Sequence, residues 1–379
     1  MKLALYVHDL KLEIGHSNSL IELIRHLPEE FSDKIEEIEV VTFTTTPLEV
    51  LFPKFKGKLK WVKVPFSGIK PVLLKSIYYQ IWTFVYNKLL QSTGKFRIGI
   101  GISCLDVDAV SIQFIHHQWT KRGLEMEASH GIRKFYKKFL FAYFEWCENF
   151  LFPKRNLKIF SPAKFLTNFL KTKAPEVDAV TIYSGVNLSR FELKAQTRQE
   201  IFQDLIGNYP VLQGLKLDEP IYLFVGAYER KGLFQALDLL ADRGNAQFIV
   251  IGSPSMGRSV QWPSSLKVFP ITFTKEVSKF YALSDVFLFP TMYEPFGLVL
   301  FEAMAMGLGI ITRRSEVGAS ELLEGLPEVY FCDSPNFSMP NIQVKNFESR
   351  KNLRDLRLEM LGDVSWSNAG KELADFIGH

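Results

Sequence analysis

The sequence has 379 residues, of which 47% are hydrophobic and 23% are charged, and its formal net charge is +4. The length predicts two domains of about 150–200 residues each, and the composition excludes a disordered chain. The slight net charge gives no indication of a nucleic-acid partner. The three cysteines lack metal-ligand spacing and provide no disulfide framework, which favours a reducing compartment, the cytoplasm.

The chain begins with the run MKLALYVHDL, which is too short for a secretory signal and predicts the first strand of a domain. No stretch of about 20 uninterrupted apolar residues follows, so we expect no membrane-spanning helix. Residues 130–158 interleave lysines and arginines with aromatic residues. This mixture is typical of a helix on an anionic bilayer surface and equally typical of a core helix with one solvated basic face.

Short β-rich runs alternate with helical patterns along the chain, which predicts an α/β fold with parallel sheets. In the first half we expect strands at 2–7, 35–43, 59–64, 97–103, 110–115, 157–162 and 179–183. In the second half we expect them at 220–227, 246–253, 266–271, 286–290 and 308–313. A polar stretch between the two sets, at 184–217, predicts a domain boundary. The pattern favours two doubly wound domains that face each other across a cleft.

Two glutamates, Glu294 and Glu302, flank the start of an apolar helix that we expect to begin near Pro295. N–H donors and the helix dipole make such a helix end suitable for a phosphate. Three backbone N–H groups would point out of it, those of Phe296, Gly297 and Leu298. Because carboxylates accept hydrogen bonds from vicinal hydroxyls, an acid on each side of a phosphate indicates a nucleotide sugar. Taken alone, Glu294 is typical of an ordinary dipole-complementing acid and Glu302 of a solvated helix position.

The stretch YEPFGLVLFEAMAMGLGIITRR resembles the E-x7-E signature of retaining GT-B glycosyltransferases of family four. Other segments resemble the same family, namely FVGAYERKGLFQALDLL, VTIYSGVNLSRF and VSWSNAGKELADF. The resemblance covers almost the whole chain and implies the GT-B fold, with two Rossmann-like domains. It places an acceptor-side domain at 1–184, a nucleotide-sugar-binding domain at 185–363, and a helix at 364–379 that crosses back to the first domain. LDVDAV and the short loop before Gly232 look most like transferases of the lipopolysaccharide core that add glucose.

The resemblance implies roles for individual side chains. Glu294 matches the acid that holds hydroxyls of the transferred sugar, and Glu302 matches the acid that binds the ribose. Arg230 and Lys231 match a basic pair that neutralises the donor diphosphate as charge accumulates on it; the alternative is a solvent-exposed turn. His116 matches a histidine near the transferred sugar, where it could bind a hydroxyl or orient the acceptor. A core histidine without such a task is the alternative.

The resemblance also implies that glycines line the donor site. Gly15 matches the glycine loop under the donor phosphates, and Gly226 and Gly252 follow two strands of the nucleotide-binding domain. The chain departs from the family at Ile14, where many members have a second glycine, and at Ala227, where many have an arginine. The first departure puts the role of the glycine loop in doubt, and at the second Arg230 could supply the missing charge.

The pair Asp106 and Asp108 forms a D-x-D, which is the metal-binding sign of the other large glycosyltransferase fold. Because GT-B members use helix ends and basic side chains instead, we expect no metal and no cofactor. Asp106 would then lie near the acceptor cleft.

These features predict a metal-independent retaining transferase that moves a hexose from a nucleoside diphosphate sugar to an acceptor hydroxyl. We expect a UDP-sugar donor, with its base near residues 269–274, and a lipopolysaccharide or other lipid-linked, cell-surface glycan as acceptor. The protein would be cytoplasmic and peripheral on the inner face of the plasma membrane through residues 130–158. Phosphorylase and epimerase activities fit this sequence less well. The alternative from another class is a non-catalytic GT-B protein that binds a nucleotide sugar or acts as a scaffold.

Overall fold

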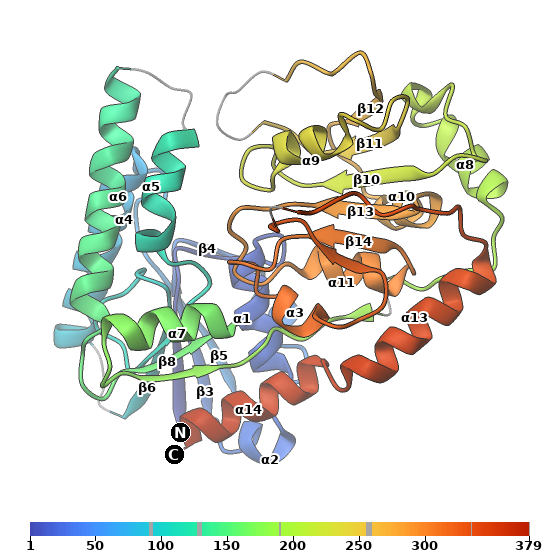
Figure 1. Cartoon of the computed structure of the whole chain (residues 1–379). Coiled ribbons are helices and arrows are strands. Elements are labelled where there is room, and N and C mark those ends of the chain that lie inside the picture. The colour runs from blue at the N-terminus through green and yellow to red at the C-terminus, as the bar shows by residue number, and fades with distance from the viewer. Residues whose placement is uncertain (91–93, 127–130, 189–190, 255–259, 335, 379) are drawn as a thin grey trace. The chain divides into compact units, whose positions relative to one another are not determined.

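The computed structural model describes residues 1–90, 94–126, 131–188, 191–254, 260–334 and 336–378. The described chain divides into two compact units, each built on a parallel sheet. Unit 1 comprises residues 1–125, 130–185 and 364–379, and unit 2 comprises residues 126–129 and 186–363. Figure 1 labels the helices and strands of both units.

Within the described residues, unit 1 contains a seven-stranded parallel sheet with the order β5-β3-β1-β6-β7-β8-β9. Its strands are β1 (Lys2–Tyr6), β3 (Glu37–Thr42), β5 (Lys58–Lys63), β6 (Lys95–Ile100), β7 (Ala109–Ser111), β8 (Lys158–Ser161) and β9 (Asp178–Thr181). The strand order reverses between β1 and β6, as it does in doubly wound sheets. Leu3, Leu5 and Tyr6 of β1 are completely buried, as expected for a central parallel strand that is covered on both faces.

All helices of unit 1 except α14 lie between these strands in the chain. The helices are α1 (Gly15–Arg25), α2 (Glu29–Ser32), α3 (Leu48–Leu51), α4 (Val72–Val85), α5 (His116–Met126), α6 (Ile132–Leu151), α7 (Lys164–Lys173) and α14 (Trp366–Gly378). A π-helical turn, η1 (Tyr86–Leu90), follows α4, and the short strands β2 (Asp9–Leu10) and β4 (Thr44–Thr45) pair beside the main sheet.

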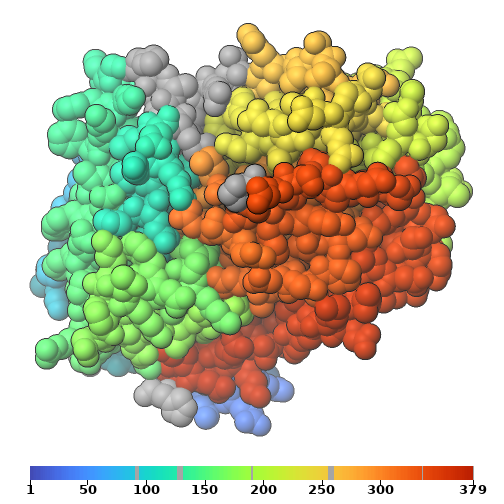
Figure 2. Space-filling view, in the orientation of Figure 1, coloured from blue at the N-terminus to red at the C-terminus, as the bar shows by residue number. Residues whose placement is uncertain are grey.

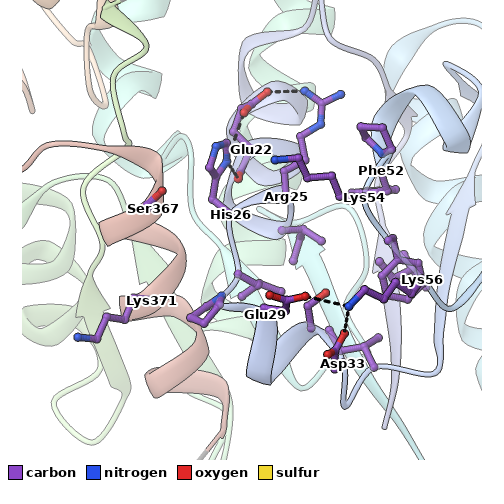
Figure 3. A pocket seen from close by; sticks show the side chains of 18 residues that line it. Glu22, Arg25, His26, Glu29, Asp33, Phe52, Lys54, Lys56, Ser367 and Lys371 are labelled. Carbon is purple, nitrogen blue, oxygen red and sulfur yellow. Dashed lines mark hydrogen bonds and ion pairs between the residues drawn. The ribbon is translucent and has the colours of Figure 1, made fainter.

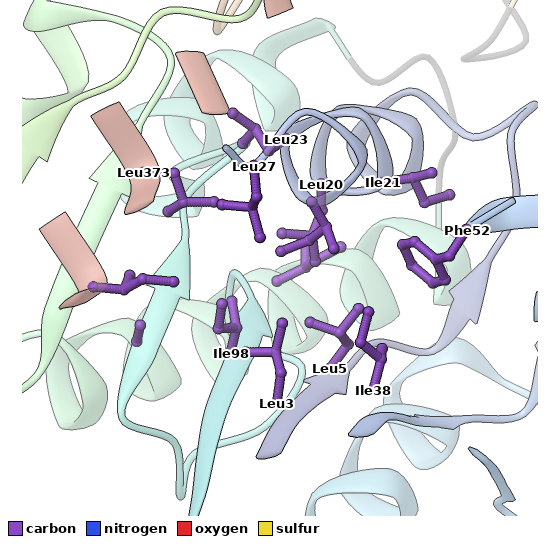
Figure 4. Packing of buried hydrophobic residues seen from close by; sticks show 14 of the residues in the cluster. Leu3, Leu5, Leu20, Ile21, Leu23, Leu27, Ile38, Phe52, Ile98 and Leu373 are labelled. Carbon is purple, nitrogen blue, oxygen red and sulfur yellow. The ribbon is translucent and has the colours of Figure 1, made fainter. Parts of the chain in front are cut away.

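The main core of unit 1 lies between α1 and the sheet. Leu20 and Leu23 of α1 belong to the same buried cluster as Leu3 and Leu5 of β1, and Leu373 of α14 completes it (Figure 4). Each of these side chains is at most 2% exposed. Burying a leucine contributes about 2 kcal/mol, so this cluster is a principal source of the stability of unit 1.

Two glycines allow α14 to pack closely against the rest of unit 1. A Cβ atom on Gly370 would lie 2.1 Å from the backbone oxygen of His26, at the end of α1. A Cβ atom on Gly185 would lie 2.3 Å from the backbone nitrogen of Trp366. Neither position accepts a side chain without movement of the backbone, so these two glycines fix how α14 packs.

The part of unit 2 that the structure describes contains a six-stranded parallel sheet with the order β12-β11-β10-β13-β14-β15. Its strands are β10 (Ile221–Val225), β11 (Gln247–Ile251), β12 (Lys267–Ile271), β13 (Val286–Phe289), β14 (Gly309–Thr312) and β15 (Val329–Phe331). Its helices are α8 (Arg198–Ile206), η3 (Pro210–Leu212, a 3₁₀ helix), α9 (Leu233–Leu240), α10 (Val277–Leu283), α11 (Leu298–Ala305), α12 (Ser320–Leu323) and α13 (Phe347–Leu361). The strand order reverses between β10 and β13, which is where doubly wound sheets bind ligands.

The predicted α/β class with two parallel sheets is confirmed, and each of the twelve predicted strands corresponds to a strand of the structure. The run predicted at 110–115 is strand only as far as Ser111. The edge strand β15 and the short β2 and β4 were not predicted. None of the helices in the described ranges is long and apolar enough to cross a membrane.

Candidate functional site

The loop after β10 carries the basic pair of unit 2. It runs from Gly226 to Gly232, which precedes α9 and has a φ of 84°. A Cβ atom on Gly232 would lie 2.3 Å from the backbone oxygen of Pro290, so only glycine allows this loop to pack against the segment after β13. Arg230 and Lys231 are thereby held at the carboxyl edge of the sheet, beside the point where the strand order reverses.

The loop after β13 carries Glu294. The backbone N–H of Glu294 donates to the oxygen of Glu316 at 2.9 Å, and the N–H of Gly318 donates to the oxygen of Glu294 at 3.0 Å. These bonds hold Glu294 in a β-bridge with Val317. The N–H of Ala319 donates to the oxygen of Phe296 at 2.7 Å, which extends the contact between the two loops.

The helix that follows begins at Leu298, so its predicted start near Pro295 is wrong by three residues. The physical reason is that Glu294 is held in a bridge, and that Gly297 has a φ of 102°, outside the helical region. Phe296 and Gly297 therefore precede the helix, and Leu298 is its first residue. A Cβ atom on Gly297 would lie 3.2 Å from Cγ of Glu294, so this glycine also leaves room for the acid.

The two loops bring Arg230, Lys231 and Glu294 together. The Lys231 ammonium and an Arg230 guanidinium nitrogen both contact Oε2 of Glu294, the latter at 3.3 Å. The Lys231 ammonium also lies 5.1 Å from the centre of the Phe289 ring. The side chains of Lys231 and Glu294 are only 15% and 12% exposed, so their charges interact with little screening by water.

Burial and charge act in opposite directions on this cluster. Burial raises the pKa of the Glu294 carboxylate, but Lys231 and Arg230 outweigh burial and hold the pKa below its ordinary value of 4.5. Burial lowers the pKa of the Lys231 ammonium below 10.5, with Glu294 opposing it. At neutral pH, Glu294 is therefore an anion between two basic side chains. Such a cluster can bind an anionic group through its cations and hydroxyl groups through its carboxylate.

Two glycines allow close packing of the chain beside this cluster. A Cβ atom on Gly226 would lie 2.7 Å from the Lys231 side chain, and one on Gly252 would lie 1.9 Å from the backbone oxygen of Gly226. Gly226 and Gly252 have φ values of 146° and 150°. Together they let the ends of β10 and β11 approach each other where the Lys231 side chain passes.

Glu302 lies on α11, one turn into the helix. Its carboxylate Oε2 accepts a hydrogen bond from the Tyr281 hydroxyl at 3.2 Å, and it also lies close enough to Lys231 to affect the pKa of that ammonium. Burial raises the pKa of Tyr281 well above its ordinary value, so Tyr281 remains a donor. The sequence did not indicate Tyr281, because the residue sits in α10 within an ordinary helical pattern.

Gly15 belongs to unit 1, where it is the first residue of α1, just beyond the central strand β1. Its backbone is not in the left-handed region, and a Cβ atom there would have no neighbouring atom within 4 Å. Packing within the described residues therefore does not require glycine at position 15.

His116 also belongs to unit 1, where it is the first residue of α5. The strand predicted at 110–115 stops at Ser111, so His116 does not directly follow a strand. Its imidazole packs against the Phe144 ring, with 4.5 Å between ring centres, and against Phe114 at 5.2 Å. Burial lowers the pKa of His116 to about 4, so the ring is neutral at pH 7 and can both donate and accept a hydrogen bond.

Arg97 binds both acids of the D-x-D pair. Its guanidinium lies 3.0 Å from Asp106 and 2.8 Å from Asp108. The main-chain N–H of Arg97 also donates to Asp108 at 2.9 Å. Both carboxylates therefore serve the packing of β6 against the turn that leads to β7. In the described parts of the chain, no group of three or more histidines, cysteines or acids is placed to hold a metal ion.

A cavity of about 750 Å³ lies in unit 1, and none of the predicted site residues lines it. It is bounded by the end of α1, by α2, by residues 52–56 and by α14 (Figure 3). Lys56 pairs there with Glu29 at 2.9 Å and with Asp33 at 3.1 Å. Because α1 returns from the carboxyl end of β1, the cavity is at the amino ends of the strands, where doubly wound sheets do not bind their ligands.

Comparison with known proteins identifies the part of the chain that holds this cluster. Residues 219–336 match the family model for glycosyl transferases group 1. An uncharacterized glycosyltransferase of Methanocaldococcus jannaschii is 32% identical over 155 residues, which cover 38% of this chain and 38% of that protein. The match thus spans well under half of the length of this curated relative.

Solved structures resemble almost the whole chain. WaaG, a glycosyltransferase involved in lipopolysaccharide biosynthesis, superposes with a TM-score of 0.62 at 16% identity, over 98% of this chain and 95% of that one. HepE of Anabaena, in complex with UDP-glucose, superposes with a TM-score of 0.51 at 13% identity, over 99% and 94%. At these identities the likeness concerns the fold. The chain therefore has the GT-B fold, and its residues 219–336 are similar to the glycosyl transferases group 1 family.

Proposed function

We propose that the protein is a retaining glycosyltransferase that moves a hexose from a nucleoside diphosphate sugar to an acceptor hydroxyl. The observation that carries this proposal is the cluster of Arg230, Lys231 and Glu294 at the carboxyl edge of β10 and β13. It combines two cations, which suit a diphosphate, with a carboxylate, which suits sugar hydroxyls. The group 1 family match over residues 219–336 supports the same class of reaction.

In this proposal Arg230 and Lys231 stabilise the diphosphate as it leaves the sugar. Negative charge accumulates on the diphosphate oxygens as the glycosidic bond breaks, and cations that are already in place need no reorganisation. Glu294 holds hydroxyls of the transferred sugar. The acceptor attacks on the face from which the diphosphate departs, and a diphosphate oxygen takes its proton. This mechanism retains the anomeric configuration without a carboxylate nucleophile, unlike that of retaining hydrolases.

We propose a UDP-sugar as the donor. HepE, which shares the fold, has been solved with UDP-glucose, and this supports uracil as the first base to test. Glu302 would bind the ribose, and residues 269–274, at the end of β12, would lie beside the base. Gly15 and His116 of unit 1 are proposed to serve the donor phosphates and the transferred sugar.

We propose that the reaction needs no metal ion. Asp106 and Asp108, the acids with metal-type spacing, are bound by Arg97, and Arg230 and Lys231 supply the positive charge in unit 2. Activity that survives a chelator is the expected result, and activity that requires an added divalent ion would contradict this part of the proposal.

The acceptor is proposed to be a lipopolysaccharide or other lipid-linked glycan, reached from the cytoplasmic face of a membrane. The support comes from α6, whose outer side carries a row of exposed apolar side chains at helical spacing: Ile132, Phe135, Phe139, Trp146 and Phe150. Ile132 is 88% exposed. Basic residues accompany this row in the first half of the helix: Arg133, Lys134, Lys137 and Lys138. Apolar anchors beside cations are typical of attachment to anionic bilayers.

The structure adds α4 to this surface. The Tyr136 hydroxyl of α6 accepts the backbone N–H of Leu73 at 3.1 Å, and Tyr143 of α6 hydrogen-bonds Gln80 of α4. Exposed apolar side chains continue along α4 and η1: Val72, Leu74, Ile81, Phe84, Val85 and Leu89. No charged residue occurs between Lys75 and Lys88. Figure 2 shows the side chains of α6 at the surface of unit 1.

A thermal-shift screen tests the proposed function. UDP, GDP and ADP would be compared with their glucose, galactose, mannose and N-acetylglucosamine conjugates, since a ligand that binds the native state raises the Tm. We expect the Tm to rise with one nucleotide and to rise further with one of its sugar conjugates. We also expect slow hydrolysis of the nucleotide sugar that binds. A nucleotide shift without hydrolysis or transfer would instead favour a non-catalytic nucleotide-sugar-binding protein. That alternative is suggested by Ile14 and Ala227. No shift with any ligand would overturn the donor assignment.

A further inference from the structure

Glu148 is a buried acid that holds the start of α5. It lies near the end of α6 and is only 2% exposed. One carboxylate oxygen accepts the backbone N–H of His116 at 2.6 Å, and the other accepts the N–H of His117 at 3.0 Å. The first N–H groups of a helix have no partner within the helix, so Glu148 acts as a cap provided by another helix. Bonds from two N–H groups to one carboxylate are charge-assisted and restrict the helix end strongly.

The same face of α6 also contacts the His116 side chain. Phe144 lies four residues before Glu148 and therefore on the same side of the helix. Its ring packs on the His116 imidazole, with 4.5 Å between ring centres. One helix thus fixes both the backbone and the ring of His116. His117 lacks this second contact with α6: it is exposed, and its ring lies near Phe169, 5.7 Å away.

The buried position of Glu148 disfavours the charged form of its carboxylate. Burial raises the pKa of Glu148 to about 7, although the N–H groups of His116 and His117 lower it. The other titratable group that affects it is Glu145, which raises the pKa from the preceding turn of α6, and Cys147 is its neighbour in the chain. A carboxylate accepts with both oxygens, whereas a protonated acid carries a hydrogen on one of them. The ionised form is therefore the one that holds both N–H groups.

We propose that Glu148 is a positioning residue, which holds α5 so that His116 presents its imidazole to a sugar hydroxyl. This inference rests on the proposed transferase function and on the role given there to His116. An apolar side chain at position 148 would avoid the cost of burying a charge. The geometry points to Glu148 because one of its two bonds ends at His116, the histidine proposed to meet the substrate, and the other ends at the next residue, His117.

The variant Glu148→Gln tests this role, because glutamine keeps the size of the side chain but offers one acceptor oxygen. We expect kcat to fall about 10- to 100-fold, the scale of a misplaced active-site group, with little change in the KM for the donor. In a His116→Ala background the same substitution should cause no further loss, because residues that act as a unit are not additive. Glu145→Gln is the matched control: it removes an acid one turn away, and kcat should stay near that of the wild type.

The pH profile separates positioning from simple stabilisation. The wild-type kcat should rise with pH through about 7, and Glu148→Gln should lack this step and resemble the wild type on its acidic side. An acid whose pKa is raised in the folded state stabilises the fold below its unfolded pKa of 4.5, and that stability is lost as pH rises through 7. At pH values above 7 the Tm of Glu148→Gln should therefore equal or exceed that of the wild type, even though its activity is lower.

Hydrogen exchange gives a readout that does not depend on turnover. Above pH 7, the amides of His116 and His117 should exchange more slowly in the wild type than in Glu148→Gln, with Glu145→Gln like the wild type. Equal exchange in all three proteins would show that Glu148 does not hold the two N–H groups. Full activity of Glu148→Gln, or additive losses with His116→Ala, would overturn the role of Glu148 in the reaction. If slow exchange is found but the wild type transfers no sugar and binds no nucleotide, the proposed function and the positioning role both fail, while the contact of Glu148 with the two N–H groups stands.

Discussion

The Lys231 ammonium and the Glu294 carboxylate form a buried ion pair within unit 2, although 63 positions separate them in the chain. The proposed function assigns them to different parts of the donor, Lys231 to the diphosphate and Glu294 to the sugar. Their contact means that each one stabilises the charge of the other. Substitutions in this cluster therefore change protein stability as well as binding, and experiments must separate the two effects.

Glu294→Gln should abolish transfer while leaving the fold intact. Glutamine fills the same space but is a weaker acceptor for sugar hydroxyls than a carboxylate. Glu294→Ala should also abolish transfer, and it should lower the free energy of unfolding by about 3 kcal/mol because it leaves a buried cation without its partner. Transfer assays and urea unfolding of both variants check this. Normal transfer by Glu294→Gln would end the assignment of Glu294 to the site.

The contribution of Glu294 to stability should depend on pH. Lys231 and Arg230 hold its folded pKa below the unfolded value of 4.5. A carboxylate with a lowered pKa stabilises the fold above its unfolded pKa, and this contribution is lost as pH falls through the folded pKa. The wild type should therefore be more stable than Glu294→Gln at pH 7, and the difference should shrink below pH 4.5. Urea unfolding across that range measures it, and a constant difference would contradict the ionised pair.

Lys231→Ala should weaken UDP binding by about 2–3 kcal/mol, the scale of a charge-assisted contact. Isothermal titration with UDP measures the change. Lys351→Ala is a suitable control, because Lys351 is an exposed lysine of the same unit. If Lys231→Ala binds UDP as tightly as the wild type, Lys231 does not belong to the phosphate site.

Gly252→Ala and Gly15→Ala should behave differently. At Gly252 the added Cβ would lie 1.9 Å from a backbone oxygen and φ is 150°, so we expect a loss of at least about 2 kcal/mol of stability. At Gly15 the added Cβ meets no atom within 4 Å, and the Tm should not fall. Loss of donor binding by Gly15→Ala with an unchanged Tm would show that a ligand approaches this backbone. Unchanged binding would remove Gly15 from the donor site.

The double variant Phe135→Ser with Phe139→Ser should reduce binding to vesicles that contain anionic lipid. The two rings are 63% and 56% exposed on α6, and their removal takes away apolar anchors without changing the charge. Flotation with anionic and neutral vesicles, at low and high salt, measures the effect. Phe273→Ser is the control, since Phe273 is an exposed phenylalanine of unit 2. If the wild type binds neither kind of vesicle, the surface of α4 and α6 is not a membrane contact.

The fold was predictable because its strands are short apolar runs between polar connections. Parallel strands that are buried on both faces are continuous apolar runs, and such runs can be recognised from the sequence alone, as the run around Leu3 and Leu5 illustrates. β15 was missed because its three residues are only partly buried and form a sheet edge. The start of α11 was misplaced because proline is common in the first turn of a helix, whereas here a β-bridge between Glu294 and Val317 holds the preceding chain.

The candidate site was only partly predictable. Glu294, Arg230 and Lys231 lie in loops whose composition marks them, and the structure brings these three together. Glu148 could not be found in this way, because an acid within a basic and aromatic helix looks like a solvated position. Its burial depends on how α6 packs against α5, and helical periodicity does not report which neighbour covers a face.

Unit 1 is discontinuous along the chain, because residues 364–379 return to it after all of unit 2. Leu373 of α14 completes the core that α1 and β1 begin. During synthesis on a ribosome, the residues of unit 2 are available to fold before α14 has been made. Until then, the flank of α1 that α14 covers stays exposed. Unit 1 therefore reaches its final packing only after α14 has been synthesised.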